Sequence, residues 1–379
     1  MNKKVVWLSL NCTIVIALLL GSCVPAAVEE EEKVEDVAID AYNLRMQGKV
    51  DEAKTLLEQD ISRNPNNAAA HYELARIQLH RALGGGRTTF DMIGDAQETI
   101  DKAVELDPKN VIYPFFAGHV NYLQAYYYLI TGGQPKEKLA RAIGAFESAL
   151  KLKPDYHQAM LYLVDLYSQF PEQAGGDKSK AEQYAKQLEA LDEVFGAKAR
   201  SILLPEEVDR VDYWQKVLKK HEGNADVIEE LGKAYLRADK VDDAVSYFEK
   251  AIEIDPEKAS LFLDLSIYHT FRAMRAGDDK ELLHKALTSG DAAVTRYIKS
   301  EPILPMLAYA LGVQSKYEGF GPWDSYPSHL GDKEQAEALF KQAEALDPYF
   351  SKATGAPTPD LFIPPGEISQ NHRYLMRPF

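Results

Sequence analysis

The sequence predicts an all-helical fold, a solenoid of about eight antiparallel helix pairs over residues 35–348. Amphipathic segments of helical length recur in pairs along this part of the chain. Small residues return at matching positions within these segments, where two helices approach each other closely. A proline follows several of the second segments and ends them, because proline cannot continue a helix.

Composition limits the functions that such a fold can serve. The 379 residues carry a formal net charge of −15, and 46% of them are hydrophobic. The chain therefore has enough apolar residues for a long core, but it lacks the basic surface that binds nucleic acids or anionic lipid headgroups. An acidic surface favours basic or neutral partners, although negative charge also keeps a long protein in solution.

Residues 1–22 have the pattern of a secretory signal peptide, with two lysines ahead of an apolar stretch. The segment Leu20–Cys23 resembles the lipobox of bacterial lipoproteins, which implies that the thiol of Cys23 is lipidated and anchors the protein. An uncleaved membrane anchor is the alternative. Val24 follows the cysteine, and by the sorting pattern of such lipoproteins it implies the periplasmic face of the outer membrane.

Two segments flank the predicted solenoid. Residues 23–34 contain a run of glutamates without apolar periodicity and are expected to form an acidic tether. Residues 349–379 contain five prolines, which exclude a regular helix. We expect an extended tail that covers the last helices, with a disordered tail as the alternative.

The clearest repeat covers residues 225–258 and is 34 residues long. It resembles the tetratricopeptide repeat (TPR) without a gap, and this resemblance implies a right-handed superhelix. Gly232 and Ala244 are expected to be the points where its two helices meet, and Pro256 to end the second helix. The matching positions are Leu231, Gly232, Tyr235, Ala244, Phe248, Ala251 and Pro256.

Looser repeats extend the pattern in both directions. Their predicted helices cover residues 49–66, 68–83 with 95–108, 111–131 with 136–154, 157–170 with 177–193, 196–203 with 206–222, 259–276 with 280–300, and 303–316 with 332–348. Insertions between paired helices are expected to gather on one face of a solenoid, often a binding face. They lie at residues 84–90, 131–135, 171–176 and 317–331.

No group of residues predicts catalysis or a cofactor. The nine histidines form no pair at metal-ligand spacing, and both cysteines lie within the first 23 residues. The glycine-rich strings at 84–87 and 175–179 lack the spacing of a phosphate loop and join helix to helix. Asp177 is expected to cap a helix instead. We therefore predict no enzyme activity, no metal and no cofactor.

The resemblance to TPR proteins implies that first helices line a concave groove. Alignment places Tyr72, Arg76, Gln158, Asp165, Glu229, Lys233 and Arg237 on it. In the best-known groove of the family, lysine and asparagine grip a peptide carboxylate, but the aligned positions here are Glu229 and Lys233. This departure argues against binding of chaperone tails.

Tyr126 is a further groove candidate, because three consecutive tyrosines at 126–128 cannot all face one core. The alternative is a core tyrosine beside a partly exposed ring.

These patterns predict a membrane-anchored scaffold that binds a protein or peptide partner in its groove, with no nucleic acid. An alternative comes from a second resemblance. The strings Gly175–Ala181 and Leu330–Ala336 are similar to a string in TPR lipoproteins found beside tripartite (TRAP) transporters, which implies a part in small-molecule transport.

Overall fold

The computed structural model describes residues 34–84, 92–130, 132–275, 279–299, 311 and 333–346. Regular structure in these residues is helical, without strands, as predicted. The predicted signal peptide, residues 23–33 of the predicted acidic tether and the tail lie outside the described residues, as do nearly all of the predicted helix 303–316 and the insertion 317–331. The last residue of the predicted tether, Val34, begins the first described helix. Among the described helices, none combines the length and apolar composition needed to cross a bilayer.

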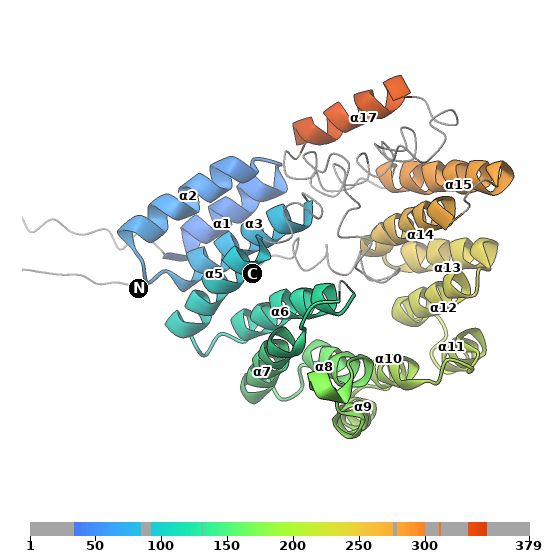
Figure 1. Cartoon of the computed structure of the whole chain (residues 1–379), viewed down its shortest axis with the longest axis horizontal. Helices are drawn as coiled ribbons and strands as arrows, with labels where there is room; N and C mark the ends of the chain where they lie inside the picture. Colours follow the sequence, from blue (N-terminus) through green and yellow to red (C-terminus); the bar gives the residue numbers. More distant parts are fainter. Residues whose placement is uncertain are drawn as a thin grey trace, which may run out of the picture. The chain divides into compact units, whose positions relative to one another are not determined.

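The described helices follow one another along the chain (Figure 1). They are α1 (Val34–Met46), α2 (Val50–Arg63), α3 (Ala68–Gly84), α5 (Ile93–Leu106), α6 (Ile112–Ile130), α7 (Lys136–Leu152), α8 (His157–Gln169), η1 (Glu172–Ala174), α9 (Lys178–Leu191), α10 (Glu193–Leu203), α11 (Arg210–Leu218), α12 (Ala225–Arg237), α13 (Val241–Ile254), η2 (Pro256–Ser260), α14 (Leu261–Arg275), α15 (Lys280–Ile298) and α17 (Lys333–Leu346).

Successive helices pack as pairs. The pairs are α1 with α2, α3 with α5, α6 with α7, α8 with α9, α12 with α13, and α14 with α15. The predicted pair 196–203 and 206–222 is looser than the others, because α10 packs mainly on α8 and α9 whereas α11 packs mainly on α12. Helix α1 completes a pair for which sequence analysis had named only the second helix.

Close packing within a pair depends on a glycine of the first helix. A Cβ atom on Gly232 would lie 2.7 Å from the Phe248 ring of α13, and one on Gly118 would lie 2.7 Å from the Phe146 ring of α7. The prediction that Gly232 is a contact point is confirmed, with an aromatic ring as its partner. Ala244 is fully buried in the same pair.

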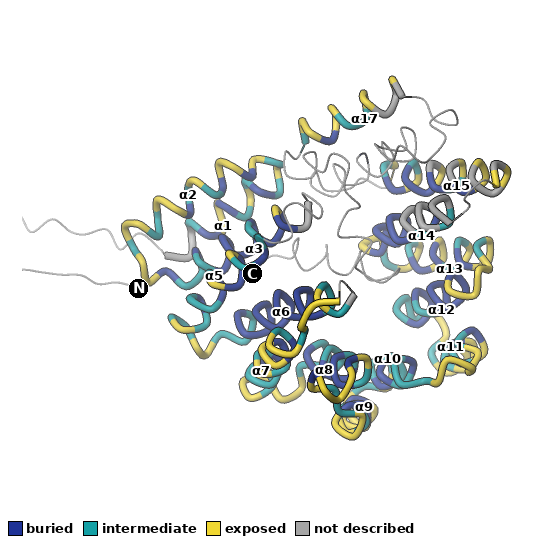
Figure 2. Tube along the Cα trace, in the orientation of Figure 1, coloured by how far each residue is buried: buried dark blue, intermediate teal, exposed yellow. Residues whose placement is uncertain are grey.

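The two helices of a pair differ in burial (Figure 2). In α2 and α13 only a narrow apolar stripe is buried, and the remaining residues are half-buried or exposed. In α6, by contrast, residues 113–125 are all buried. A helix that is enclosed all round lies inside a packed structure, so the first helices form the enclosed side of the array.

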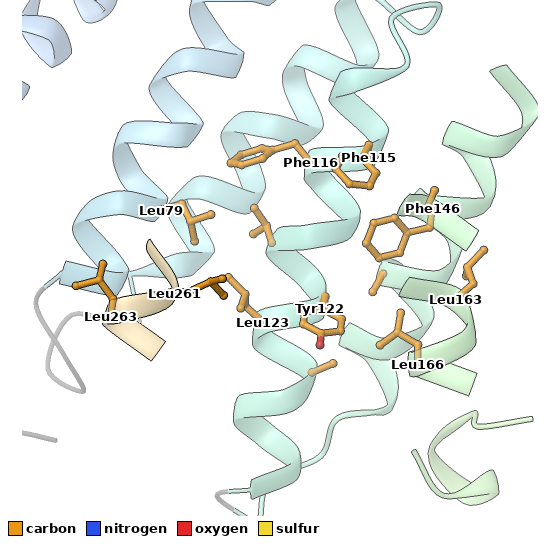
Figure 3. Packing of buried hydrophobic residues seen from close by; sticks show 14 of the residues in the cluster. Leu79, Phe115, Phe116, Tyr122, Leu123, Phe146, Leu163, Leu166, Leu261 and Leu263 are labelled. Atoms are coloured by element: carbon orange, nitrogen blue, oxygen red, sulfur yellow. The ribbon is translucent and has the colours of Figure 1, made fainter. Parts of the chain in front are cut away.

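The apolar core runs through the first helices. Phe115, Phe116, Tyr122 and Leu123 of α6 belong to one cluster of buried side chains that also includes Phe146 of α7 (Figure 3). The same cluster continues in both directions along the chain. It includes Leu79 of α3, Leu163 and Leu166 of α8, and Leu261 and Leu263 of α14.

The insertion between α8 and α9 forms a tight turn. Gly175 has φ +117°, a conformation that favours glycine, and a Cβ atom on Gly176 would lie 1.8 Å from the Phe170 carbonyl oxygen. The Asp177 carboxylate then accepts hydrogen bonds from the backbone N–H groups of Ser179 (3.0 Å) and Lys180 (3.1 Å). Asp177 therefore caps α9, as predicted.

Candidate binding surface on the first helices

The eight predicted groove residues all lie on first helices, but they differ in accessibility. Tyr72, Arg76, Glu229 and Lys233 are buried, whereas Arg237 is exposed. The half-buried ones are Tyr126, Gln158 and Asp165. We call the face of α3, α6, α8 and α12 that carries these eight residues the first-helix row. That it binds a partner stays a prediction.

The row begins with a buried charge cluster between α1 and α3, which we call the α1–α3 bridge. Arg45 Nε donates to Glu73 Oε1 at 2.7 Å, and an Arg76 guanidinium nitrogen donates to Glu73 Oε2 at 2.9 Å. All three side chains are 0% exposed. One carboxylate is thus shared by two guanidinium groups in a site without water contact.

Two tyrosine rings flank these guanidinium groups. The Arg76 guanidinium carbon lies 5.4 Å from the ring centroids of both Tyr42 and Tyr72, at cation–π distance. Burial lowers the pKa of Arg45. At Arg76 burial acts in the same direction, but the charge of Glu73, the two tyrosines and the hydrogen bond to Glu73 together outweigh it and raise the pKa. Burial also raises the pKa of Tyr72. The bridge therefore brings two guanidinium groups, one carboxylate and two phenol rings together in a buried site.

The middle of the row is aromatic. The Tyr162 ring of α8 stacks on Phe146 with a centroid distance of 4.8 Å, and its hydroxyl lies 3.3 Å from His119 Nδ1. Burial lowers the pKa of His119 to about 3, so this imidazole is neutral. The Tyr126 hydroxyl donates to Asp165 at 2.6 Å and thereby joins α6 to α8.

The three consecutive tyrosines separate as the helix geometry requires. Tyr126 and Tyr127 are half-buried, and Tyr128 is exposed. The hydrogen bond from Tyr126 to Asp165 shows that the structure brings two predicted groove residues together.

The row ends in a second charge cluster, which we call the α12–η2 bridge. Glu229 accepts hydrogen bonds from Lys233 at 2.7 Å and from Lys258 at 2.7 Å. Lys258 also reaches Asp226 at 2.5 Å. The three central side chains are 7% exposed or less, whereas the side chain of Asp226 is 42% exposed.

Electrostatics keep the α12–η2 bridge charged. Burial acts to lower the pKa of Lys233, but the nearby charges of Glu229, Glu230 and Asp264 outweigh it and raise that pKa above its ordinary value. The pKa of Lys258 is raised in the same way by Glu229 and Asp226. Both lysines are therefore ammonium cations held at fixed positions.

Arg76, Glu229 and Lys233 were predicted from the sequence, whereas Arg45, Glu73, Asp226 and Lys258 were not. Glu73 and Arg76 are spaced i,i+3, and Glu229 and Lys233 are spaced i,i+4, so each of these ion pairs can be predicted from the sequence of a single helix. Arg45 and Lys258 come from neighbouring elements, 28 and 29 residues away from the glutamates they contact. No single-helix pattern could reveal them.

The polar groups of the row that reach solvent belong to the half-buried and exposed residues Tyr126, Gln158, Asp165 and Arg237, whereas the buried charges are bonded within the protein. Within the described part of the chain, no three or more His, Cys, Asp or Glu side chains are placed to hold a metal ion.

Comparison with known proteins identifies repeats in two parts of the chain. Tetratricopeptide-repeat family profiles match residues 225–258 and residues 41–85. The first match has the same bounds as the repeat predicted from sequence. The chain therefore contains tetratricopeptide repeats, which serve generally as protein-interaction scaffolds rather than as catalysts.

Solved structures of other repeat proteins are similar to the chain. A thermophilic TPR protein from Thermus thermophilus shares 21% identity at a TM-score of 0.35, over 59% of this chain and 92% of that one. A TPR protein from Parabacteroides merdae shares 15% identity at a TM-score of 0.32, over 83% and 93%. Among curated proteins the chain has no match.

Proposed function

We propose that this chain is a membrane-anchored scaffold that binds a protein or peptide partner along its first-helix row, on the periplasmic face of the outer membrane. One observation carries the proposal for the row: charged residues follow one face of α12 at helical spacing, and the α12–η2 bridge fixes them. Charges that are already held in place lose little conformational entropy on binding. Asp226 and Arg237, at the ends of this face, reach solvent.

Photo-crosslinking in cells tests the partner site. A photoreactive phenylalanine at Arg237, on α12, should give a discrete crosslinked product that mass spectrometry can identify. The matched control is Glu253, which is exposed on α13, the second helix of the same repeat. Equal products from both positions, or none from Arg237, would count against the first-helix row as the partner site.

Anchoring is a separate part of the proposal and rests on the lipobox resemblance of residues 20–23. Stable membrane attachment needs two or more acyl chains, which a fully lipidated Cys23 would supply. Substitution Cys23→Ser should move the protein from the membrane fraction to the soluble fraction with an unchanged circular dichroism spectrum. Retention in the membrane fraction would contradict lipid anchoring at Cys23.

A further inference from the structure

The same place on the first helix carries a polar residue in several helix pairs. In α6 and α12 this residue comes three positions after the glycine that meets a phenylalanine ring, so Asn121 follows Gly118 and Tyr235 follows Gly232. In α3 a fully buried alanine takes the place of that glycine. His269 of α14 lies one repeat length of 34 residues after Tyr235. We call this place the inter-helix position, and its residues in α3, α6, α8, α12 and α14 are Gln78, Asn121, Tyr167, Tyr235 and His269.

In α8 and α12 a tyrosine fills the inter-helix position. The Tyr235 ring stacks on Tyr247 of α13, the second helix of its pair, with ring centroids 5.2 Å apart. The Tyr167 ring stacks in the same way on Tyr184 of α9, at 6.2 Å. The Tyr167 hydroxyl donates to Glu147 of α7 at 3.1 Å, and the Tyr235 hydroxyl accepts from a glutamine of α11 at 2.7 Å. The hydroxyl group at this position therefore joins a helix pair to the helix before it.

The other pairs have small residues opposite the inter-helix position. In α9 and α13 the stacked tyrosine comes three residues after the first buried alanine of the helix. At the same distance from their first buried alanine, α5, α7 and α15 have Thr99, Ala145 and Ser289. A tyrosine on the first helix thus occurs with a tyrosine on the second, whereas glutamine, asparagine or histidine occurs with a small residue.

These shorter residues bring buried polar atoms into the inter-helix position. Within the described part of the chain, Gln78 Oε1, Asn121 Oδ1 and His269 Nδ1 are buried and have no hydrogen-bond partner. Asn121 is 1% exposed, and its Nδ2 donates to the backbone carbonyl of Ala117 at 2.8 Å. This bond fixes the orientation of the amide, because a flipped amide would place two oxygen atoms against each other. Asn121 Oδ1 is therefore an acceptor that still needs a donor.

The surroundings of Asn121 supply further hydrogen-bonding groups. One turn further along α6, Gln124 Nε2 donates to Gln97 Oε1 of α5 at 3.1 Å, and Lys138 Nζ of α7 donates to the same oxygen at 2.9 Å. Gln97 and Gln124 are both buried. The three helices thus meet at polar groups. A buried water typically makes about three hydrogen bonds to such groups, and it satisfies a buried acceptor that no protein donor reaches.

We propose that Asn121 Oδ1 binds a buried water molecule between α5, α6 and α7, and that Gln78 and His269 bind equivalent waters in their own helix pairs. The bound water has the part that the tyrosine hydroxyl has in α8 and α12. The proposal goes beyond the proposed function and stands without it, because the site requires no partner protein.

Magnetisation transfer from water tests the proposal in the full chain in solution. With 15N-labelled asparagine, the Asn121 side-chain amide should show cross peaks to water that have opposite signs in NOESY and ROESY spectra. Opposite signs mark a water that stays bound while the protein tumbles. The variant Asn121→Leu assigns these peaks, because it removes them. Peaks of equal sign, as surface water gives, or no peaks at Asn121 would overturn the proposal.

Asn67 is the matched control, because it is also 1% exposed but is satisfied at both ends of its amide. Its Nδ2 donates to Asp60 Oδ2 at 2.7 Å, and its Oδ1 accepts from the backbone N–H of Ala70 at 3.1 Å. Asn67 should show no water peaks of this kind. Equal peaks at Asn67 and Asn121 would contradict a water site that is specific to the inter-helix position.

A crystal structure of the chain gives an independent measurement. Solvent density should lie within about 3.2 Å of Asn121 Oδ1, Gln78 Oε1 and His269 Nδ1. A protein donor bonded to Asn121 Oδ1, or no density beside it, would overturn the proposal.

Discussion

The two charge clusters of the first-helix row have the same plan and different surroundings. In each, a glutamate of a first helix sits between a cation one turn along its own helix and a cation from a neighbouring element. Glu73 is held by Arg76 and Arg45, and Glu229 is held by Lys233 and Lys258. The α1–α3 bridge is completely dry, whereas the α12–η2 bridge continues into Asp226, which is partly in water.

This difference separates a structural role from a binding role. A fully buried ion cluster is destabilised strongly when one member is removed, because the remaining charges cannot regain water. In a cluster that reaches solvent, a charged group can instead pair with water or with a charged group of a ligand. We infer that the α1–α3 bridge mainly fixes the packing of two repeats, and that the α12–η2 bridge presents charges to a partner.

The largest expected effect comes from neutralising the glutamates. Glu73→Gln leaves two buried guanidinium groups without their shared anion and should lower the free energy of unfolding by about 3–5 kcal/mol. Glu229→Gln should cost less than half of that, because Asp226 and Glu230 remain near the two lysines. Urea denaturation of both variants checks this order, and a reversed order would break the comparison.

The second effect concerns pH and the aromatic segment between the bridges. Burial lowers the pKa of His119 to about 3, whereas in the unfolded chain it is about 6.5. As pH falls below about 6.5, the unfolded state takes up the proton first, so stability is complete above that pH and falls as pH drops toward 3. Between pH 7 and pH 5 the loss should be about 2 kcal/mol.

The variant His119→Gln isolates this contribution. The difference in unfolding free energy between pH 7 and pH 5 should become smaller by about 2 kcal/mol in the variant. His284→Gln is the matched control, because His284 is exposed on α15. An identical pH dependence in the His119 variant and the wild-type chain would contradict a buried, neutral imidazole.

The third prediction concerns the contact between a glycine and a phenylalanine ring, which occurs in both halves of the helix array. Gly118→Ala and Gly232→Ala should each destabilise the protein by about 1–3 kcal/mol, because the new methyl group meets a phenylalanine ring. Gly144 lies in α7, and a Cβ atom added there would meet nothing from the rest of the described chain within 4 Å. Gly144→Ala should therefore stabilise the protein by up to about 1 kcal/mol. Thermal melts of the three variants distinguish these outcomes.

The smallest expected change in the free energy of unfolding comes from exchanging arginine for lysine, or lysine for arginine. Arg76→Lys removes the planar guanidinium that faces Tyr42 and Tyr72, at an expected cost of about 1–2 kcal/mol. Lys233→Arg keeps the positive charge beside Glu229 and should cost less than about 1 kcal/mol. Equal losses of unfolding free energy in urea denaturation would show that the aromatic rings do not make the α1–α3 bridge more sensitive to the exchange than the α12–η2 bridge.

Much of this architecture could be predicted from single segments of sequence. The repeat at residues 225–258 has strong 3.6-residue periodicity, a small residue at each helix contact and a terminating proline, so its bounds agree with the structure and the family match. The cap at Asp177 was predictable for the same reason, because a cap depends on neighbours within three residues.

The remaining features depend on residues that are distant in sequence. Helix α1 has a weak apolar pattern, and only its packing on α2 and α3 shows its place. Arg45, Lys258 and the Tyr126–Asp165 hydrogen bond join different helices, and tertiary packing decides such contacts. The burial of Tyr72 and Arg76 likewise follows from packing, whereas alignment could only place them on the row.

The most direct test of the contrast between the bridges is a pair of double-mutant cycles at low and high salt. One cycle joins Arg45 to Glu73, and the other joins Lys258 to Glu229. Salt screens exposed charges far more than buried ones. We predict a coupling free energy for Arg45 and Glu73 that is larger and unchanged between about 0.05 and 1 M salt, and a smaller one for Lys258 and Glu229 that declines. Equal couplings with the same salt dependence would contradict the distinction between a dry structural bridge and a hydrated binding bridge.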